Sequence, residues 1–288
     1  MAETIALVTD STASVPAEAV RTHGIDVVPL QVVIGARSYD EGTEATPETV
    51  AAALRKFEPV STSRATPQAM SDAYERAASA GASAVVSIHL SAEISATYES
   101  AQMAAQGSPI PVLTVDSRSV GMGTAMAVLA AVRARDAGAG ADGTAAAAQA
   151  CADATRSFFY VDTLEYLRRG GRVGMAAALV GSALAVKPLL VVRDGRIVPL
   201  EKVRTAARAL ARLEELAVAA VPDGNARVAV QHLANPLRAQ EMAQRLRERL
   251  SLADVPVSEV GAVIGAHVGP GMVAVVVAPG DDVGWSAA

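Results

Sequence analysis

The sequence predicts an α/β protein with two domains: a mostly parallel α/β/α domain at residues 1–155 and an α+β domain with a mixed sheet at residues 156–288. Two observations lead to this fold class. In the first half, short runs of β-branched residues alternate with alanine-rich stretches, as they do in βαβ units. From Phe158 onward strands and helices are mixed, and the run VVRDGRIVPL has the form of a hairpin with Asp194-Gly195 at its turn.

The elements of the first domain follow from local patterns. A strand is expected at residues 5–9, and a helix should follow it, with Ser14 and Pro16 at its start and Gly24 at its end. Residues 25–34 resume an extended apolar pattern. The remaining expected elements are helices starting at Thr46-Pro47 and Thr66-Pro67, strands at 84–88 and 111–115 with a helix between them that ends near Gly107, and two alanine-rich helices within 121–155.

The second domain should add to its hairpin two later strands, at residues 228–233 and 272–278, with a helix at 236–250 between them. A hydrophobic fraction of 51% in 288 residues is enough to bury a substantial core in both domains. Because aromatic residues make up only 3% of the chain, an internal cavity should be walled by aliphatic side chains, which favours a flexible apolar ligand over a flat base.

Charge and composition argue against several classes of function. The net charge of -5 and the pI of about 5.5 disfavour binding to nucleic acid or to anionic lipid headgroups. The N-terminal residues do not resemble a secretory signal, and no apolar run has membrane-spanning length. The single Cys151 cannot form an intrachain disulfide and provides no metal cluster. We therefore expect a cytoplasmic protein without stable membrane insertion and without a metal site.

The first candidate segment is VTDSTASVP, in which Asp10, Ser11 and Thr12 follow the first strand. Ligands bind at the carboxyl ends of the strands in doubly wound sheets, so these side chains could line a site. An Asx turn with a helix cap would explain the same residues. Both interpretations stay open from the sequence alone.

The second candidate segment is VSTSRATP, in which Thr62 and Ser63 precede a helix that begins near Pro67. A helix start offers unpaired N–H groups and the positive end of the helix dipole, and nearby hydroxyls add donors for an anion. Capping by Thr66 is the structural alternative, but it leaves Thr62 and Ser63 unexplained.

The third candidate segment is SIHLSAEISATYESA, in which Ser95, Ala96 and Thr97 stand at a predicted helix start. Two hydroxyls around a small residue would let a carboxylate or a phosphate approach the backbone N–H groups closely. Hydrophilic helix caps are common, so ordinary capping is the alternative interpretation.

The fourth candidate segment is YLRRGGRVG, in which a sharp turn at Gly170 and Gly171 would leave Arg168, Arg169 and Arg172 projecting. Such a cluster could dock an acidic partner or a phosphate. The alternative is a solvated basic turn.

Two further residues of the second domain could bind an anion. Arg204 ends a predicted strand and could neutralise a ligand, or it could simply pair with Glu201. His267 is expected in a glycine-rich turn, where Gly269 and Gly271 would remove side chains that block access to the imidazole. Such a histidine could donate to a carboxylate, act as a base or form a covalent adduct. No Ser-His-Asp spacing, metal-binding histidine pair or P-loop accompanies it, so catalysis by this chain alone is the weaker interpretation.

Taken in order, the segments VTDST, TSRATP, LSAEISATY, YLRRGGRVG, DGRIVPLEKVR and GAHVGPG resemble the signature series of the DegV family of fatty-acid-binding proteins, over nearly the whole chain. The resemblance implies two α/β domains that hold a fatty acid in a tunnel, with its carboxylate near the domain interface. It also implies a non-enzymatic binding subunit of a fatty acid kinase, which presents the carboxylate to a separate ATP-dependent kinase protein. The acyl phosphate would then enter phospholipid synthesis, and the fatty acid would be the only ligand, without a further cofactor.

The resemblance also assigns roles to individual residues by motif position. The carboxylate site would comprise Thr62, Ser63, Ser95, Ala96, Thr97, Arg204 and His267; the supporting loop Asp10, Ser11, Thr12 and Gly269; and the partner-docking surface Arg168, Arg169 and Arg172. The chain departs from the family pattern at Ala96, where glycine is common, and at Arg64, where glutamine is common. Arg64 would add a charge near the headgroup of the ligand.

Two alternatives from other functional classes remain. One is an enzyme in which His267 and Asp10 act on a small carbonyl or phosphorylated substrate, by analogy of fold with dihydroxyacetone-kinase-type domains. The other is a lipid sensor that regulates another protein without phosphoryl transfer.

Overall fold

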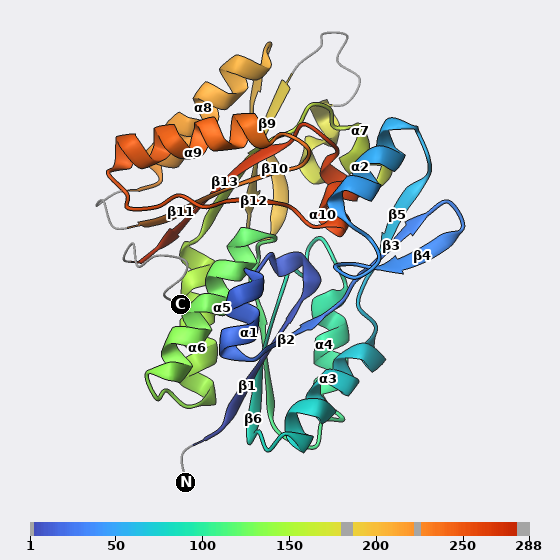
Figure 1. Ribbon diagram of the computed structural model, residues 1–288, viewed down its shortest axis with the longest axis vertical. Coiled ribbons are helices and arrows are strands. Elements are labelled where there is room, and N and C mark those ends of the chain that lie inside the picture. Colours follow the sequence, from blue (N-terminus) through green and yellow to red (C-terminus); the bar gives the residue numbers. More distant parts are fainter. Residues whose placement is uncertain (1–2, 180–186, 222–225, 281–288) are drawn as a thin grey trace. The chain divides into compact units, whose positions relative to one another are not determined.

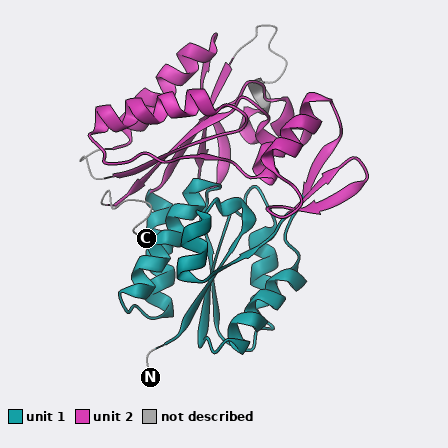
Figure 2. Ribbon diagram, viewed as in Figure 1, with its two compact units in different colours: residues 1–30, 63–154, 285–288 teal, residues 31–62, 155–284 magenta. Residues whose placement is uncertain are grey.

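The computed structural model describes residues 3–179, 187–221 and 226–280, and these residues form two compact units (Figures 1 and 2). Unit 1 contains residues 3–30 and 63–154, and unit 2 contains residues 31–62 and the described residues from 155 to 280. Within the described residues the chain therefore changes units three times. The sequence-based division into 1–155 and 156–288 lacks the excursion of residues 31–62, because this segment joins unit 2 through contacts with residues far later in the chain, such as Val263 and His267. Residues 281–288 lie outside the described residues.

The sheet of unit 1 is parallel, with the described strands in the order β2-β1-β6-β7. Its strands are β1 (Ile5–Asp10), β2 (Ile25–Val28), β6 (Ala84–His89) and β7 (Val112–Asp116). Leu7 of β1 lies opposite Ile25 on one side and Val86 on the other. Every residue of β6 is buried, as expected for a central strand covered on both faces.

Helices cover both faces of this sheet, with α5 and α6 on one face and α3 and α4 on the other (Figure 1). The helices are α1 (Ala17–His23), α3 (Pro67–Ser79), α4 (Thr97–Ala105), α5 (Met122–Asp136) and α6 (Ala141–Ala154), and a short 3-10 turn, η1, spans Ser11–Ala13. Thr66 caps α3 by accepting a hydrogen bond from Ala69 N at 3.1 Å, and Pro67 is the first residue of the helix, as predicted. Gly24 ends α1 with a φ of 61°.

The main sheet of unit 2 is mixed, with the described strands in the order β10-β9-β8-β13-β11-β12. Its strands are β8 (Arg156–Tyr160), β9 (Lys187–Arg193), β10 (Arg196–Val203), β11 (Ala226–His232), β12 (Val257–Glu259) and β13 (Val273–Pro279). β11 and β12 are parallel, and the other neighbouring pairs are antiparallel. The predicted hairpin is confirmed: Arg193 lies opposite Arg196, and Asp194 and Gly195 between them have positive φ angles of 50° and 77°.

Two long helices, α8 (Ala206–Ala219) and α9 (Pro236–Leu250), lie over one face of this sheet (Figure 1). Their apolar sides pack on the strands in a core that includes Leu213, Met242, Leu246, Tyr160 and Val275. At the surface of this layer the nearly buried carboxylate of Glu214 on α8 accepts from Arg245 and Arg249 on α9, both at 2.8 Å, and so links the two helices.

The excursion of residues 31–62 supplies a smaller sheet and a helix to unit 2. These elements are β3 (Gln31–Ile34), β4 (Arg37–Asp40), α2 (Pro47–Arg55) and β5 (Val60–Ser63), with the strand order β4-β3-β5 in the described chain. The rest of unit 2 adds α7 (Glu165–Arg169), the 3-10 segment η2 (Gly174–Leu179) and α10 (Ala262–Val268).

Helix α10 anchors the excursion to the rest of unit 2. It packs against α2, α7 and β3. The buried carboxylate of Glu41 accepts a hydrogen bond from Val263 N at 2.7 Å, at the start of α10. Gly261 leaves room for this carboxylate, which a Cβ at that position would overlap. The excursion therefore caps the helix that carries His267. Among the described helices, none has both the length and the apolar character needed to cross a membrane.

Candidate functional site

The central pair of the candidate site joins β5 to α10. Thr62 Oγ1 on β5 lies 2.8 Å from His267 Nε2, although the two residues are 205 positions apart in the sequence. His267 lies in the last turn of α10, so its predicted place in a glycine-rich turn was wrong. The helix continues to Val268, and the turn begins only at Gly269. Both side chains are partly buried.

The imidazole of His267 is held in its neutral form. Its burial, and to a lesser extent the positive charge of Arg172, lower the pKa of His267 to about 4. Nδ1 is buried and has no hydrogen-bond partner among the described residues. At neutral pH one ring nitrogen therefore carries a hydrogen and the other is an acceptor. Among the described residues Nε2 is bonded to Thr62, whereas Nδ1 has no partner.

The imidazole packs against the backbone of Gly170, the residue that follows α7. A Cβ at Gly170 would overlap Nδ1 of His267 and lie 2.6 Å from Cε1. Gly170 has an ordinary φ of −75°, so only this close approach requires glycine there.

Two other glycines have different roles from those the sequence suggested. Gly269, with a φ of 72°, lies against the ring of Tyr166, and Gly271, with a φ of 96°, lies against the carboxylate of Asp162. The interpretation that they clear access to the imidazole was therefore wrong, since the glycine beside the imidazole is Gly170 from a distant segment. Sequence proximity to the histidine had suggested the wrong pair.

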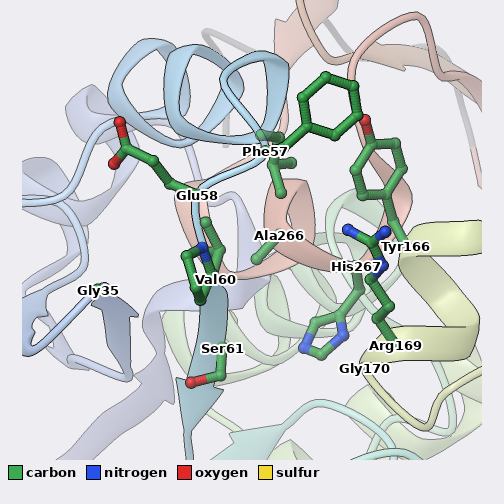
Figure 3. Close-up of a pocket in the computed structure, with 12 residues that line it drawn as sticks. Gly35, Phe57, Glu58, Val60, Ser61, Tyr166, Arg169, Gly170, Ala266 and His267 are labelled. Carbon is green, nitrogen blue, oxygen red and sulfur yellow. The ribbon is translucent and has the colours of Figure 1, made fainter.

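A pocket of about 330 Å³ lies beside His267, and all of its lining belongs to unit 2 (Figure 3). Its lining combines apolar residues with a few polar ones: Gly35, Leu54, Phe57, Glu58, Pro59, Val60, Ser61, Tyr166, Arg169, Gly170, Ala266 and His267. Phe57 is 81% exposed and has a φ of 58°, which is rare for an aromatic residue. The pocket therefore gives the protein surface an opening toward the histidine.

The predicted hydroxyl pair at the start of α4 is present in unit 1. Ser95 Oγ lies 3.0 Å from Thr97 Oγ1 and accepts from Thr97 N at 3.3 Å. Ala96 is the N-cap residue and provides no side-chain cap. Because one hydroxyl donates to the other, one hydroxyl hydrogen is not used within the pair.

Ser63 and Arg64 follow Thr62 and are exposed. Arg64 Nη1 lies 3.7 Å from the carboxylate of Glu99 in the first turn of α4, with both side chains exposed. This weak surface pair offsets part of the charge that Arg64 adds to the family pattern.

Arg204 is exposed at the end of β10 and makes no ion pair with the described residues. The alternative that it pairs with Glu201 was wrong, because Arg212 of α8 binds that carboxylate at 2.8 Å. The charge of Arg204 is therefore available for another group.

The arginine cluster lies at the end of α7. Arg168 and Arg169 are exposed, and both bind the carboxylate of Glu165, at 2.8 and 2.7 Å. The hydrogen bonds from the two arginines lower the pKa of Glu165 to about 2. Arg172 donates to Gly170 O at 2.6 Å. Since two exposed cations share one carboxylate, this surface carries an excess of positive charge.

The loop after β1 has the contacts of the turn-and-cap interpretation. Asp10 is fully buried and accepts from Thr12 N at 3.1 Å, from Thr12 Oγ1 at 2.5 Å and from Leu90 N at 3.0 Å. The hydroxyl of Ser11 accepts from Leu30 N at 2.9 Å. These bonds stabilise the turn and leave the carboxylate of Asp10 enclosed in unit 1.

A buried chain of polar residues in unit 1 was missed from the sequence. His89 Nδ1 lies 3.0 Å from Asp10 Oδ2, His89 Nε2 lies 2.7 Å from Ser87 Oγ, and that hydroxyl lies 2.9 Å from the hydroxyl of Tyr74. The order Asp-His-Ser resembles a hydrolase triad, but all four residues are fully buried and Ser87 is shared with Tyr74. Burial raises the pKa of Tyr74 to about 12. The chain is structural, and its signal was the two-residue spacing of Ser87 and His89 on a strand beside Asp10.

No group of three or more His, Cys, Asp or Glu side chains suited to a metal ion occurs in the part of the chain that the structure describes.

Comparison with known proteins identifies close relatives of the chain. The model of the family described as "Uncharacterised protein, DegV family" matches residues 4–280. A DegV domain-containing protein of Streptomyces coelicolor is 52% identical over 278 residues, which cover 96% of this chain and 99% of the relative.

Two solved structures are also similar. One is described as DegV, a fatty acid binding protein from Bacillus subtilis; it is 33% identical, with a TM-score of 0.89 over 96% of this chain and 99% of that one. The other, described as showing fatty acid binding of a DegV family protein from Thermus thermophilus, is 30% identical, with a TM-score of 0.88 over the same shares of the two chains.

Proposed function

Because this chain belongs to the DegV family, we propose that it binds a long-chain fatty acid and presents the carboxylate to a separate ATP-dependent kinase. The kinase would transfer the γ-phosphoryl group of ATP to a carboxylate oxygen, which gives an acyl phosphate and ADP. The acyl phosphate would then serve phospholipid synthesis in the cytoplasm. The fatty-acid-binding relatives support the ligand class, and the geometry around His267 supports the mode of binding.

The observation that carries this proposal is the bond between Thr62 Oγ1 and His267 Nε2. If Nε2 is protonated, it donates to Thr62 and leaves the hydroxyl hydrogen of Thr62 free. If Nε2 accepts from Thr62 instead, Nδ1 carries the free hydrogen. In either tautomer the neutral pair keeps one donor that it does not use internally. A carboxylate, which has only acceptors, is a matching ligand.

Neutral donors also suit a carboxylate that must react. A buried ion pair would hold the anion strongly but would withdraw charge from the oxygen that attacks phosphorus. The neutral pair of a hydroxyl and an imidazole gives the carboxylate one hydrogen-bond donor and leaves its charge in place. The apolar tail would supply most of the affinity, at about 0.8 kcal/mol for each CH₂ group removed from water.

Motif position assigns further residues to the carboxylate. These are Ser95 and Thr97, whose pair has a spare hydroxyl hydrogen, and Arg204, which is exposed. Their share in binding is tested by comparing Ser95→Ala and Arg204→Gln with the wild-type protein in the binding assay below.

The surface at the end of α7 is the proposed docking site for the kinase. Arg168 and Arg169 are exposed with excess positive charge, and Arg169 and His267 line the same pocket. Arg172 lies close enough to His267 to influence its pKa. An acidic kinase surface bound here would have an opening toward the histidine.

Binding is tested first by mass spectrometry of an organic extract of the purified protein, before and after incubation with fatty acids. We expect a long-chain fatty acid to be recovered. The delipidated protein is then titrated with palmitic acid, with hexadecanol and with methyl palmitate. The acid should bind most tightly because it alone offers an anionic acceptor. Recovery of no acyl ligand after incubation, or equal binding of all three compounds, would contradict the proposal.

Presentation to a kinase is tested by adding ATP and a candidate kinase and trapping acyl phosphate with hydroxylamine. Arg168→Glu should reduce transfer without weakening fatty-acid binding, because Arg168 is exposed and does not line the pocket beside His267. Fatty-acid binding without transfer by any cognate kinase would favour the lipid sensor. ATP-independent turnover that His267→Ala abolishes would favour the enzyme, although Asp10, its proposed partner, is fully buried and already bonded.

A further inference from the structure

The contact between Gly170 and His267 decides which tautomer of the histidine the fold accepts. The missing Cβ of Gly170 would overlap Nδ1, and its distances of 2.6 Å to Cε1 and 3.3 Å to Cγ place it at the Nδ1–Cε1 edge of the ring. Glycine carries a hydrogen in that direction instead. The Nδ1 atom therefore faces a C–H group at close range.

A proton on Nδ1 would be unfavourable in this place. It would point toward the hydrogen of Gly170, and it would be a buried N–H without an acceptor, since Nδ1 has no partner among the described residues. An unprotonated Nδ1 instead presents its lone pair to the C–H group, which is a weakly favourable contact. The same contact thus penalises one tautomer and tolerates the other.

We propose that Gly170 is a positioning residue: it keeps His267 protonated at Nε2, so that Nε2 donates to Thr62 and the Thr62 hydroxyl hydrogen points to the ligand. The role of that hydrogen in binding a carboxylate rests on the proposed function. The assignment of the tautomer does not. Thr62 thereby becomes the donor, and His267 the residue that orients it.

Packing between α7 and α10 maintains this contact from both sides. His267 of α10 packs on Gly170, the residue that follows α7, and two residues further along the chain Gly269 lies against the ring of Tyr166 of α7. Each segment thus contributes one ring and one glycine. A shift of α7 along α10 would break both contacts together, so the position of the Gly170 backbone relative to the imidazole is well defined.

The tautomer is measured directly by long-range ¹H–¹⁵N NMR on delipidated protein labelled at its four histidines, near neutral pH. His267→Gln assigns the signal of His267. We expect a protonated Nε2 and an unprotonated Nδ1. A protonated Nδ1, or an equal mixture of the two forms, would overturn the proposal even if the protein binds fatty acids well. If the expected tautomer is found but the protein does not bind fatty acids, the proposed function is wrong and the tautomer assignment stands.

The role of Gly170 is measured with Gly170→Ala, whose backbone angles suit alanine, so the change acts through the added Cβ. We expect fatty-acid affinity to fall about 10- to 100-fold, with loss of the wild-type NMR signature of His267. The control is Gly107→Ala, an exposed site where the nearest atom to a new Cβ is Ala104 O at 4.0 Å; it should leave affinity unchanged.

A double-mutant cycle separates positioning from general damage. In a His267→Gln background, Gly170→Ala should change affinity by less than about threefold, because the residue through which it acts is already gone. An equal loss in both backgrounds would show that Gly170 supports the fold rather than the histidine. If Gly170→Ala does not fold, the NMR measurement on the wild-type protein still decides the tautomer.

Discussion

Thr62→Val is the substitution that most directly probes the proposed carboxylate site. Valine has nearly the same shape as threonine and suits a strand equally well, so β5 should remain intact. The change removes the hydroxyl that lies 2.8 Å from His267 Nε2. A bound carboxylate then loses its proposed donor, and Nε2 loses the hydroxyl with which it is paired.

The magnitude follows from the kind of bond that is lost. A hydrogen bond to a charged group contributes about 1.5–3 kcal/mol, so the dissociation constant should rise by roughly 10- to 150-fold. The tail contacts should not change. Two CH₂ groups are worth about 1.6 kcal/mol, so palmitate should bind roughly 15-fold more tightly than myristate in both proteins. Head and tail contributions should therefore be additive.

The assay is a calorimetric titration of delipidated protein with the two acids. Thr43→Val is the matched control, because Thr43 is exposed in a turn of the same unit and its hydroxyl lies 3.5 Å from Asp40 O. The control should bind both acids as the wild type does. If Thr62→Val binds palmitate within about threefold of the control, the Thr62–His267 pair does not hold the carboxylate and the reasoning fails.

Three further perturbations test the surroundings of His267. Gly269→Ala should lower the free energy of unfolding by roughly 2–5 kcal/mol, because φ is 72° there and a Cβ would overlap Tyr166. Urea denaturation measures this loss with Gly107→Ala as the control, and equal stabilities of the two variants would contradict the prediction. Glu41→Ala should lower the free energy of unfolding by about 1–3 kcal/mol and speed hydrogen exchange at the start of α10, since Val263 N loses its acceptor. Unchanged exchange at Val263 would exclude a capping role for Glu41. Because the folded-state pKa of His267 is about 4, below the ordinary value of about 6.5, the unfolded state takes up the proton first and stability should fall by up to about 3 kcal/mol as pH drops from 6.5 to 4. His267→Gln should remove that contribution from unfolding curves measured across this pH range, and an unchanged pH slope would refute the assignment.

Local patterns predicted most elements of the fold. The helix at 236–250 was predicted at the limits of α9, and the hairpin turn at Asp194-Gly195 was confirmed, because capping residues and positive-φ turns are encoded within a few positions. The run 25–34 shows where this information ends. It continues as one apolar stretch, yet β2 pairs with β1 in unit 1, whereas β3 pairs with β4 in unit 2 and packs against α10, which comes more than 200 residues later in the chain.

The candidate site likewise has a part that the sequence predicted and a part that it did not. Motif positions suggested both Thr62 and His267, and their hydrogen bond supports reading them together. The partners that surround them could not be assigned from sequence neighbourhood: Gly269 was taken as the glycine that exposes the imidazole, whereas Gly170 is the one in contact with it. The structural role of a glycine depends on which side chain packs against it, and tertiary packing decides which side chain that is.

The excursion of residues 31–62 has a consequence for synthesis of the chain. Helix α2, with the buried Val50, packs against α10, and Glu41 caps α10, so both need partners that leave the ribosome roughly 200 residues later. At about 5–20 residues per second, this delay lasts on the order of 10–40 s. Throughout that interval the apolar side of α2, including Val50 and Leu54, lacks its final covering. Newly made chains should therefore offer chaperones a binding segment at α2 until α10 has been synthesised.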